Sequence, residues 1–66
     1  MPRETEFVMA KELRDGNFGH PQDELPHGRG KVIRILNDSG VLTIDCENSC
    51  VMRDMNAPVE RYKREP

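Results

Sequence analysis

The stretch from Lys31 to Cys46 constrains the fold of this chain more than any other part of it. Lys31 to Leu36 ("KVIRIL") is rich in β-branched residues, and Val41 to Cys46 ("VLTIDC") alternates between two faces. Asn37 to Gly40 ("NDSG") separates them, and Asn, Asp and Gly tolerate the positive φ of tight hairpin turns. Two β-rich runs around a four-residue polar turn predict a central hairpin over residues 31–46.

The alternation in the second run also predicts which side chains share a face. Leu42, Ile44 and Cys46 fall on one face of the predicted strand because successive strand residues point to opposite sides. Val41, Thr43 and Asp45 then fall on the other face. We expect the first set to point inward.

Further short strands are predicted outside the hairpin. Residues 50–55 ("CVMRDM") predict a third strand after a polar break, and residues 59–65 ("VERYKRE") are either a final edge strand or a helical tail. Residues 4–14 contain helix formers throughout but also alternate, with Phe7, Met9 and Leu13 on one side. We favour a strand there, because it would add to the sheet that follows.

The length and composition fit one small domain, residues 1–66. Trp is absent and the apolar fraction is 35%, so a modest core must come mainly from Val, Ile, Leu and Met. Four or five short strands joined by Gly- and Pro-rich turns predict an all-β fold, a small antiparallel barrel. No apolar run approaches the length of a membrane span or a signal-peptide core, so we expect a cytoplasmic protein without membrane contact.

The charges are distributed unevenly along the chain. The formal net charge is −2, and residues 1–26 carry three basic and six acidic side chains. A general attraction to phosphate is therefore not expected, whereas a local basic face is. The candidate binding residues form one basic group in the middle of the chain and another in the charged tail at 59–66: Arg29, Lys31, Arg34, Arg61, Lys63 and Arg64. Phe18 and Tyr62 are candidate stacking groups beside them.

The loop "GHPQDELPHGRG", residues 19–30, contains two histidines that could bind a metal together with Asp23 or Glu24. Six residues separate His20 from His27, and metal sites favour closer, fixed spacings. The prolines beside them stiffen the loop and set the direction in which the chain enters and leaves it, and this is a sufficient structural reason for their presence. We therefore expect a loop that binds no metal tightly.

A cluster of sulfur-containing side chains supports an alternative function. Cys46, Cys50, Met52 and Met55 lie within ten residues, and thiolate and thioether ligands are those that Cu(I) selects. On a hairpin the two cysteines flank the turn and could face each other, with Met52 on the same side as Cys50. The alternative interpretation is that buried Cys and Met fill a core poor in Leu and Phe, and we favour it.

Two family resemblances cover the hairpin. The stretch "GRGKVIRILNDSGVLTID", residues 28–45, resembles a KOW motif, the hairpin of SH3-like barrels in ribosomal proteins and transcription elongation factors. The matching features are Gly30-Lys31-Val32, the alternating Ile33 and Ile35, and Gly40 before Val41. Residues 30–47 also resemble the small periplasmic copper-binding barrels of the CusF type, in which Cys46 would occupy the position of a ligand His. Both resemblances imply a small barrel, SH3-like or OB-like, of four or five strands.

No arrangement of side chains predicts catalysis. Ser39 and Ser49 lie in turns, the histidines lie in a loop, and nothing in the sequence fixes a Cys46–His pair. We therefore expect a non-enzymatic binding module without a cofactor, acting on RNA or on a protein of the transcription or translation machinery. The alternatives are a Cu(I) carrier using the Cys/Met cluster and a protein-only adaptor or inhibitor.

Overall fold

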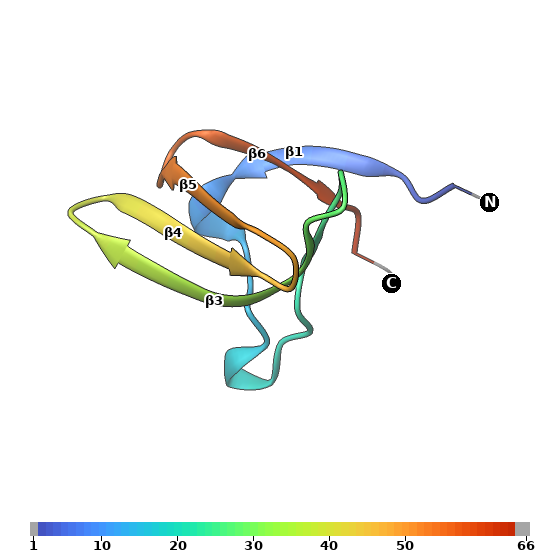
Figure 1. Cartoon of the computed structure of the whole chain (residues 1–66), viewed down its shortest axis with the longest axis horizontal. Helices are drawn as coiled ribbons and strands as arrows, with labels where there is room; N and C mark the ends of the chain where they lie inside the picture. Colours follow the sequence, from blue (N-terminus) through green and yellow to red (C-terminus); the bar gives the residue numbers. More distant parts are fainter. Residues whose placement is uncertain (1, 65–66) are drawn as a thin grey trace.

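The computed structural model describes residues 2–64, and strands account for nearly all of its regular structure (Figure 1). Two short 3₁₀ helices, η1 (Ala10–Glu12) and η2 (Asn17–Gly19), complete it. The strands are β1 (Thr5–Met9), β2 (Glu24–Leu25), β3 (Gly30–Asp38), β4 (Val41–Cys46), β5 (Cys50–Asp54) and β6 (Pro58–Tyr62). The predicted all-β class is confirmed.

The predicted central hairpin is formed by β3 and β4, which pair antiparallel up to Asp38 and Val41. The two residues between them have positive φ, +53° at Ser39 and +85° at Gly40. The side-chain oxygen of Asn37 accepts a hydrogen bond from the Gly40 N–H at 3.0 Å. The turn predicted over Asn37–Gly40 therefore closes the hairpin, but only Ser39 and Gly40 form it, because Asn37 and Asp38 still pair within β3.

The remaining strands complete two sheets. β5 pairs with β4 and confirms the predicted third strand, so the larger sheet has the order β2-β3-β4-β5. β1 pairs with β6 in a second, two-stranded sheet. The strand interpretation of residues 4–14 is confirmed for Thr5–Met9 but is wrong after Met9, where η1 follows and Leu13 is buried, unlike the exposed Phe7 and Met9. The strand alternative for the final segment is confirmed at Pro58–Tyr62, and residue 65 lies outside the described part of the chain.

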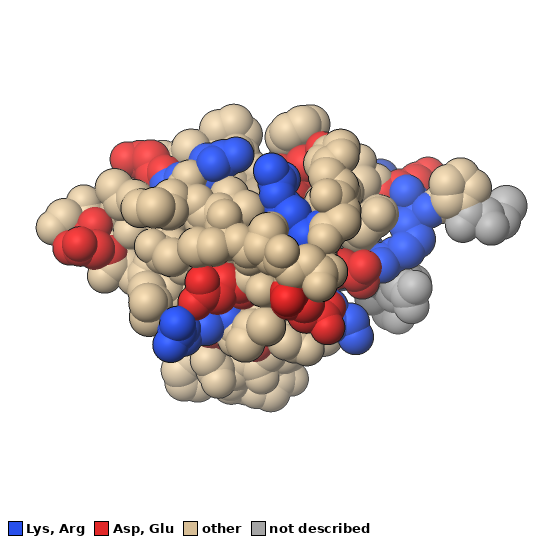
Figure 2. Space-filling model, in the orientation of Figure 1, with Lys and Arg blue, Asp and Glu red and all other residues tan. Residues whose placement is uncertain are grey.

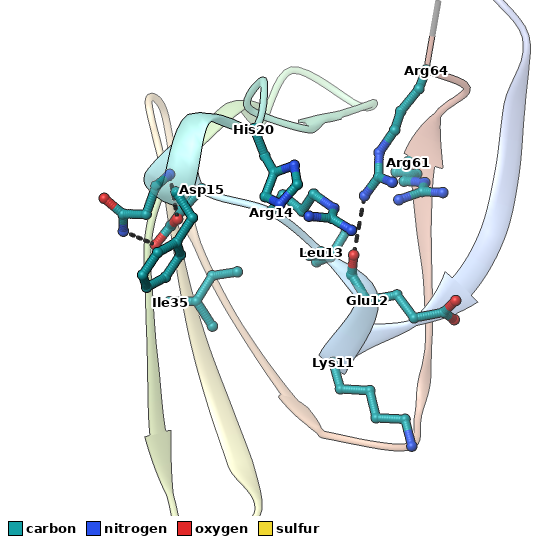
Figure 3. Close-up of a pocket in the computed structure, with 11 residues that line it drawn as sticks. Lys11, Glu12, Leu13, Arg14, Asp15, His20, Ile35, Arg61 and Arg64 are labelled. Carbon is teal, nitrogen blue, oxygen red and sulfur yellow. Dashed lines mark hydrogen bonds between the residues drawn. The ribbon is translucent and has the colours of Figure 1, made fainter.

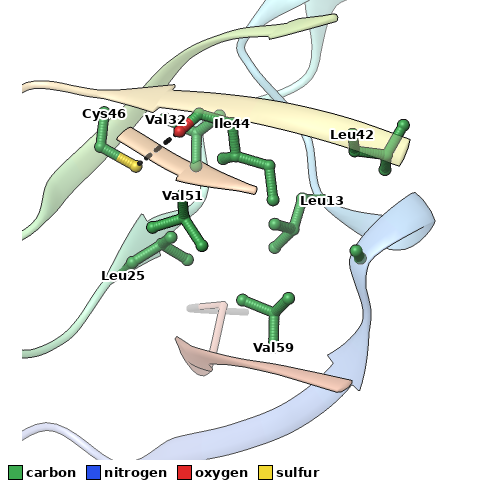
Figure 4. Packing of buried hydrophobic residues seen from close by; sticks show 9 residues of the cluster. Leu13, Leu25, Val32, Leu42, Ile44, Cys46, Val51 and Val59 are labelled. Atoms are coloured by element: carbon green, nitrogen blue, oxygen red, sulfur yellow. Dashed lines mark hydrogen bonds between the residues drawn. The ribbon is translucent and has the colours of Figure 1, made fainter. Parts of the chain in front are cut away.

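The core lies between the curled four-stranded sheet and the two-stranded sheet (Figure 4). As predicted, Leu42, Ile44 and Cys46 are buried on one face of β4. In β1 the small Val8 packs against the core opposite Val59, and its larger neighbour Phe7 is 70% exposed. The buried apolar residues are Ala10, Leu13, Leu25, Val32, Leu42, Ile44, Cys46, Val51 and Val59.

The prediction of one continuous loop over residues 19–30 is wrong at Glu24 and Leu25. These residues pair with Lys31 and Gly30 and form β2. Leu25 is almost completely buried, and the burial of its side chain attaches the segment to the core. A two-residue strand is too short to produce a period-two pattern in the sequence, and the flanking prolines made this one look like a loop.

Candidate functional site

Asp23 joins three distant segments of the chain. Its carboxylate is 1% exposed and accepts hydrogen bonds from two arginine side chains. Arg64 donates to both of its oxygens at 2.8 and 2.9 Å, and Arg61 donates to Oδ2 at 3.3 Å. The backbone N–H of Arg14 also donates to Oδ2, at 2.8 Å. The segment before β2 and the C-terminal residues are therefore fixed against each other.

The charge of Asp23 is maintained by these contacts. Burial disfavours the ionised carboxylate, but the hydrogen bonds from Arg64 and Arg14 and the charges of Arg61 and Arg64 outweigh it. The net result is a pKa below the ordinary value of 3.8. Asp23 is therefore ionised at neutral pH and holds Arg64 in place.

Three of the predicted binding residues lie around one open pocket of about 420 Å³, here called the Tyr62 pocket. Lys31 reaches it from β3, and Lys63 and Arg64 follow directly after β6. The complete lining is Arg3, Pro21, Gln22, Asp23, Glu24, Lys31, Tyr62, Lys63 and Arg64. Four cationic side chains and two acidic ones line this pocket, and one of the acidic ones is the enclosed Asp23.

Arg3 was not singled out from the sequence, although it completes the Tyr62 pocket. Its guanidinium stacks over the Tyr62 ring at 4.1 Å from the centroid and contacts Glu24 Oε1 at 2.7 Å. Lys63 pairs with Glu4 at 3.1 Å in an exposed contact, whereas Lys31 has no ion pair within residues 2–64. In Figure 2, Lys and Arg side chains gather at the right-hand end beside the chain termini, and the rest of this face mixes both signs.

The other predicted binding residues lie elsewhere. Arg61 points inward, is buried, and donates two hydrogen bonds to Glu6 in addition to its contact with Asp23. Arg34 pairs with Asp45 across β3 and β4 at 2.8 Å. Arg29 lies in the turn before β3 and does not line the Tyr62 pocket. The structure thus gives Arg61 a structural role, and of the six predicted binding residues only Lys31, Lys63 and Arg64 line the Tyr62 pocket.

The Cys/Met cluster does not form one site in the structure. Cys46 is buried in the core, whereas Cys50 is exposed and lies opposite Asp45 in the β4–β5 register. Met52 points outward like Cys50, and Met55 packs against the core. Burial raises the pKa of Cys46, and a hydrogen bond to Asp45 raises that of Cys50, so both are neutral thiols at neutral pH. The expectation that the two cysteines face each other is therefore wrong, because they lie on opposite faces of the sheet.

The two histidines also have different surroundings. His27 contacts Glu60 Oε1 through Nε2 at 2.8 Å, and this hydrogen bond is the largest cause of the lowered pKa of Glu60. His20 is exposed at the edge of a second pocket. Among residues 2–64, no three His, Cys, Asp or Glu side chains lie close enough together to hold a metal ion.

Comparison of the chain with protein-family models, with curated proteins and with solved structures found no match. The resemblances to KOW and CusF-type barrels therefore stay predictions. None of the helices in the described residues has the length and apolar character that a membrane crossing requires.

Proposed function

We propose that this protein is a non-enzymatic binding module that holds RNA at the Tyr62 pocket. One observation supports this most strongly: Lys31 meets Lys63 and Arg64, which lie 32 and 33 residues later in the sequence, around a pocket where Arg3 stacks on Tyr62. Together with the KOW resemblance of residues 28–45, the proposal describes an SH3-like module that works in the cytoplasm.

The chemistry of the pocket fits a phosphate backbone with accessible bases. Ammonium and guanidinium groups contact phosphates, and aromatic rings stack on bases that are not paired. The ammonium of Lys31 has no ion pair within residues 2–64, so a phosphate would not have to displace a carboxylate from it. Because the whole chain is acidic, the expected footprint is small and the binding strongly weakened by salt.

A charge-reversal pair tests this proposal. Lys31→Glu places a negative charge in the Tyr62 pocket, and Arg53→Glu makes the same change in net charge at an exposed residue that lines neither pocket. The probe is a fluorescein-labelled oligouridine of about ten nucleotides, within the range that small single-strand-binding domains cover. Fluorescence anisotropy at low salt gives the affinity.

We expect Lys31→Glu to weaken binding about tenfold and Arg53→Glu to change it by less than about twofold. In the parent, the logarithm of the affinity should fall with the logarithm of salt with a slope of about −2, the value for three contacted phosphates on a single strand. Equal effects of the two variants, or no RNA binding by the parent, would reject the proposal. A protein with an acidic surface would then be the remaining partner for these cations.

A second candidate function, that of a protein adaptor, is favoured by the outer face of the larger sheet. Leu36, Thr43 and Met52 stand in register across β3, β4 and β5, and both large apolar side chains are about half exposed or more. Exposed apolar groups gathered on one sheet face are typical of protein contacts. A Met52→Lys variant should then lose a protein partner in co-purification and keep its affinity for oligouridine.

A further inference from the structure

A second open pocket of about 510 Å³ adjoins the Tyr62 pocket, and Arg64 lines both. We call it the Arg14 pocket. Residues of η1, the loop from Asp15 to His20, Ile35 of β3 and the arginines Arg61 and Arg64 line it (Figure 3). Arg14, Arg61, Arg64 and His20 contribute nitrogen groups to its lining, and Phe18 and Ile35 contribute apolar surface. The two pockets therefore form one continuous surface on either side of Arg64.

Arg14 has the chemistry of an anion-binding group in this pocket. Its guanidinium has no ion pair within residues 2–64, whereas Arg61 and Arg64 both pair with Asp23. The acidic residues of the lining are occupied with local contacts. Asp15 accepts two hydrogen bonds from Asn17, and the carboxylate of Glu12 accepts one from the Met9 N–H. The Arg14 guanidinium is thus available to an anion from outside the chain.

Phe18 is held in solvent at the rim of the same pocket. Its side chain is 97% exposed, although a Phe side chain gains about 1.5–3 kcal/mol from burial. Its backbone has φ +59° and ψ +30°, a left-handed conformation that is unfavourable for a bulky residue. Gly16 and Gly19 beside it also have positive φ. Strained backbone positions cluster at ligand-binding sites, so this exposed aromatic side chain is a candidate contact for a ligand.

The loop that carries Phe18 is anchored at its base. The N–H of Arg14 donates to the Asp23 carboxylate at 2.8 Å, and the N–H of Asp23 donates to the Arg14 carbonyl at 3.0 Å. The side chain of Gln22 donates to the Val32 carbonyl at 2.9 Å and fixes the loop to β3. Asp23 also binds Arg64, so the same residue positions the loop and the cation shared by the two pockets.

We infer that the bound RNA is a single strand that crosses Arg64 from the Tyr62 pocket into the Arg14 pocket, with one base stacked on Phe18 and a phosphate at Arg14. This inference rests on the proposed function and specifies its ligand. Stacking on Phe18 requires a base whose faces are free, and bases in a duplex are already stacked on their neighbours. Arg64, which lines both pockets, would contact the backbone between the nucleotide in the Tyr62 pocket and the base stacked on Phe18.

Substitutions at Phe18 test the stacking contact without disturbing the fold, because the side chain is exposed. Phe18→Ala and Phe18→Leu should each weaken binding of the labelled oligouridine about tenfold, the effect expected for loss of one stacked base. Phe18→Tyr keeps a flat ring and should bind like the parent. Arg14→Gln should also weaken binding and reduce the salt slope by about 0.7, the contribution of one phosphate on a single strand. A self-complementary RNA duplex of the same length should bind at least tenfold more weakly than oligouridine.

The outcomes separate this inference from the proposed function. If Lys31→Glu weakens binding but Phe18→Ala and Arg14→Gln do not, RNA binds at the Tyr62 pocket alone and the inference is wrong. Equal affinity for duplex and single strand would also overturn it. If the parent binds neither RNA, or if excess oligoglutamate displaces oligouridine without regard to Phe18, the proposed function fails as well. Weaker binding by Phe18→Leu with full binding by Phe18→Tyr is the result that supports a stacked base.

Discussion

Asp23 is the residue on which both pockets depend. Its buried carboxylate accepts hydrogen bonds from the backbone N–H of Arg14 and from the side chains of Arg61 and Arg64. Arg64 in turn lines both pockets. A buried ion pair adds little stability compared with an apolar core, but removal of one partner leaves an uncompensated charge in the interior. Asp23 therefore matters for stability and for the placement of Arg64.

We predict that Asp23→Asn lowers the free energy of unfolding by about 3 kcal/mol, the lower end of the range for a broken buried ion pair. The lower end applies because Arg61 keeps its contact with Glu6. Urea unfolding followed by circular dichroism measures the change. Asp38→Asn is the matched control, since Asp38 is exposed at the end of β3 and its substitution should change the stability by less than about 0.5 kcal/mol. Equal effects of the two variants would contradict the central role of Asp23.

The stabilisation that Asp23 contributes should depend on pH in one direction. Because the folded pKa of Asp23 is lower than its ordinary value of 3.8, the stabilisation is complete above that value and is lost as the pH falls through the folded pKa. The stability difference between the parent and Asp23→Asn should thus be constant from about pH 5 to 8 and shrink below about pH 4. A difference that grows as the pH falls would show that Asp23 is not held ionised.

At the scale of the elements, the β3–β4 turn shows a local compromise. Its two central residues both have positive φ, and the first of them is Ser39. Two-residue hairpin turns with this backbone favour Asn-Gly, because Asn tolerates the left-handed region better than Ser. The Ser39-Gly40 pair therefore closes the turn, but with a less favourable residue than Asn at its first position.

Ser39→Asn should raise the free energy of unfolding by about 0.5 kcal/mol, because Asn relieves part of the backbone cost at this position. Gly40→Ala should lower it by about 1 kcal/mol, since φ is +85° there. The nearest atom to the added methyl group would be Met55 Sδ at 3.7 Å, so the loss would come from the backbone and not from a clash. Thermal unfolding of both variants checks the prediction, and changes of the same sign would contradict it.

Elements with a repeating pattern could be predicted from the sequence, and elements without one could not. The alternation in residues 41–46 and the turn residues at 37–40 were sufficient for the hairpin, because both signals are local. β2 was missed because two residues carry no period. In β1 the sequence correctly showed two faces, but which face is buried depends on its pairing with β6, where Val8 lies opposite Val59.

At the scale of the whole molecule, the site could be predicted only in part. The charges of Lys31, Lys63 and Arg64 were visible in the sequence, but their meeting depends on how β2, β3 and β6 are placed. Arg61 looked equivalent to Lys63, yet the β1–β6 register sets it opposite Glu6 on the inner face. No pattern in the sequence pointed to Arg3, because its role depends on stacking over Tyr62.

The most direct test of the account is a two-dimensional amide spectrum recorded during titration with oligouridine. We predict that the shifts concentrate on Lys31, Tyr62, Lys63, Arg14 and Phe18, and that Leu36, Thr43 and Met52 on the outer face of the larger sheet stay unchanged. This is expected because the first set belongs to the two pockets joined at Arg64 and the second does not. Shifts confined to the outer face, or a spectrum that does not change at all, would contradict the proposal that this protein binds RNA at these pockets.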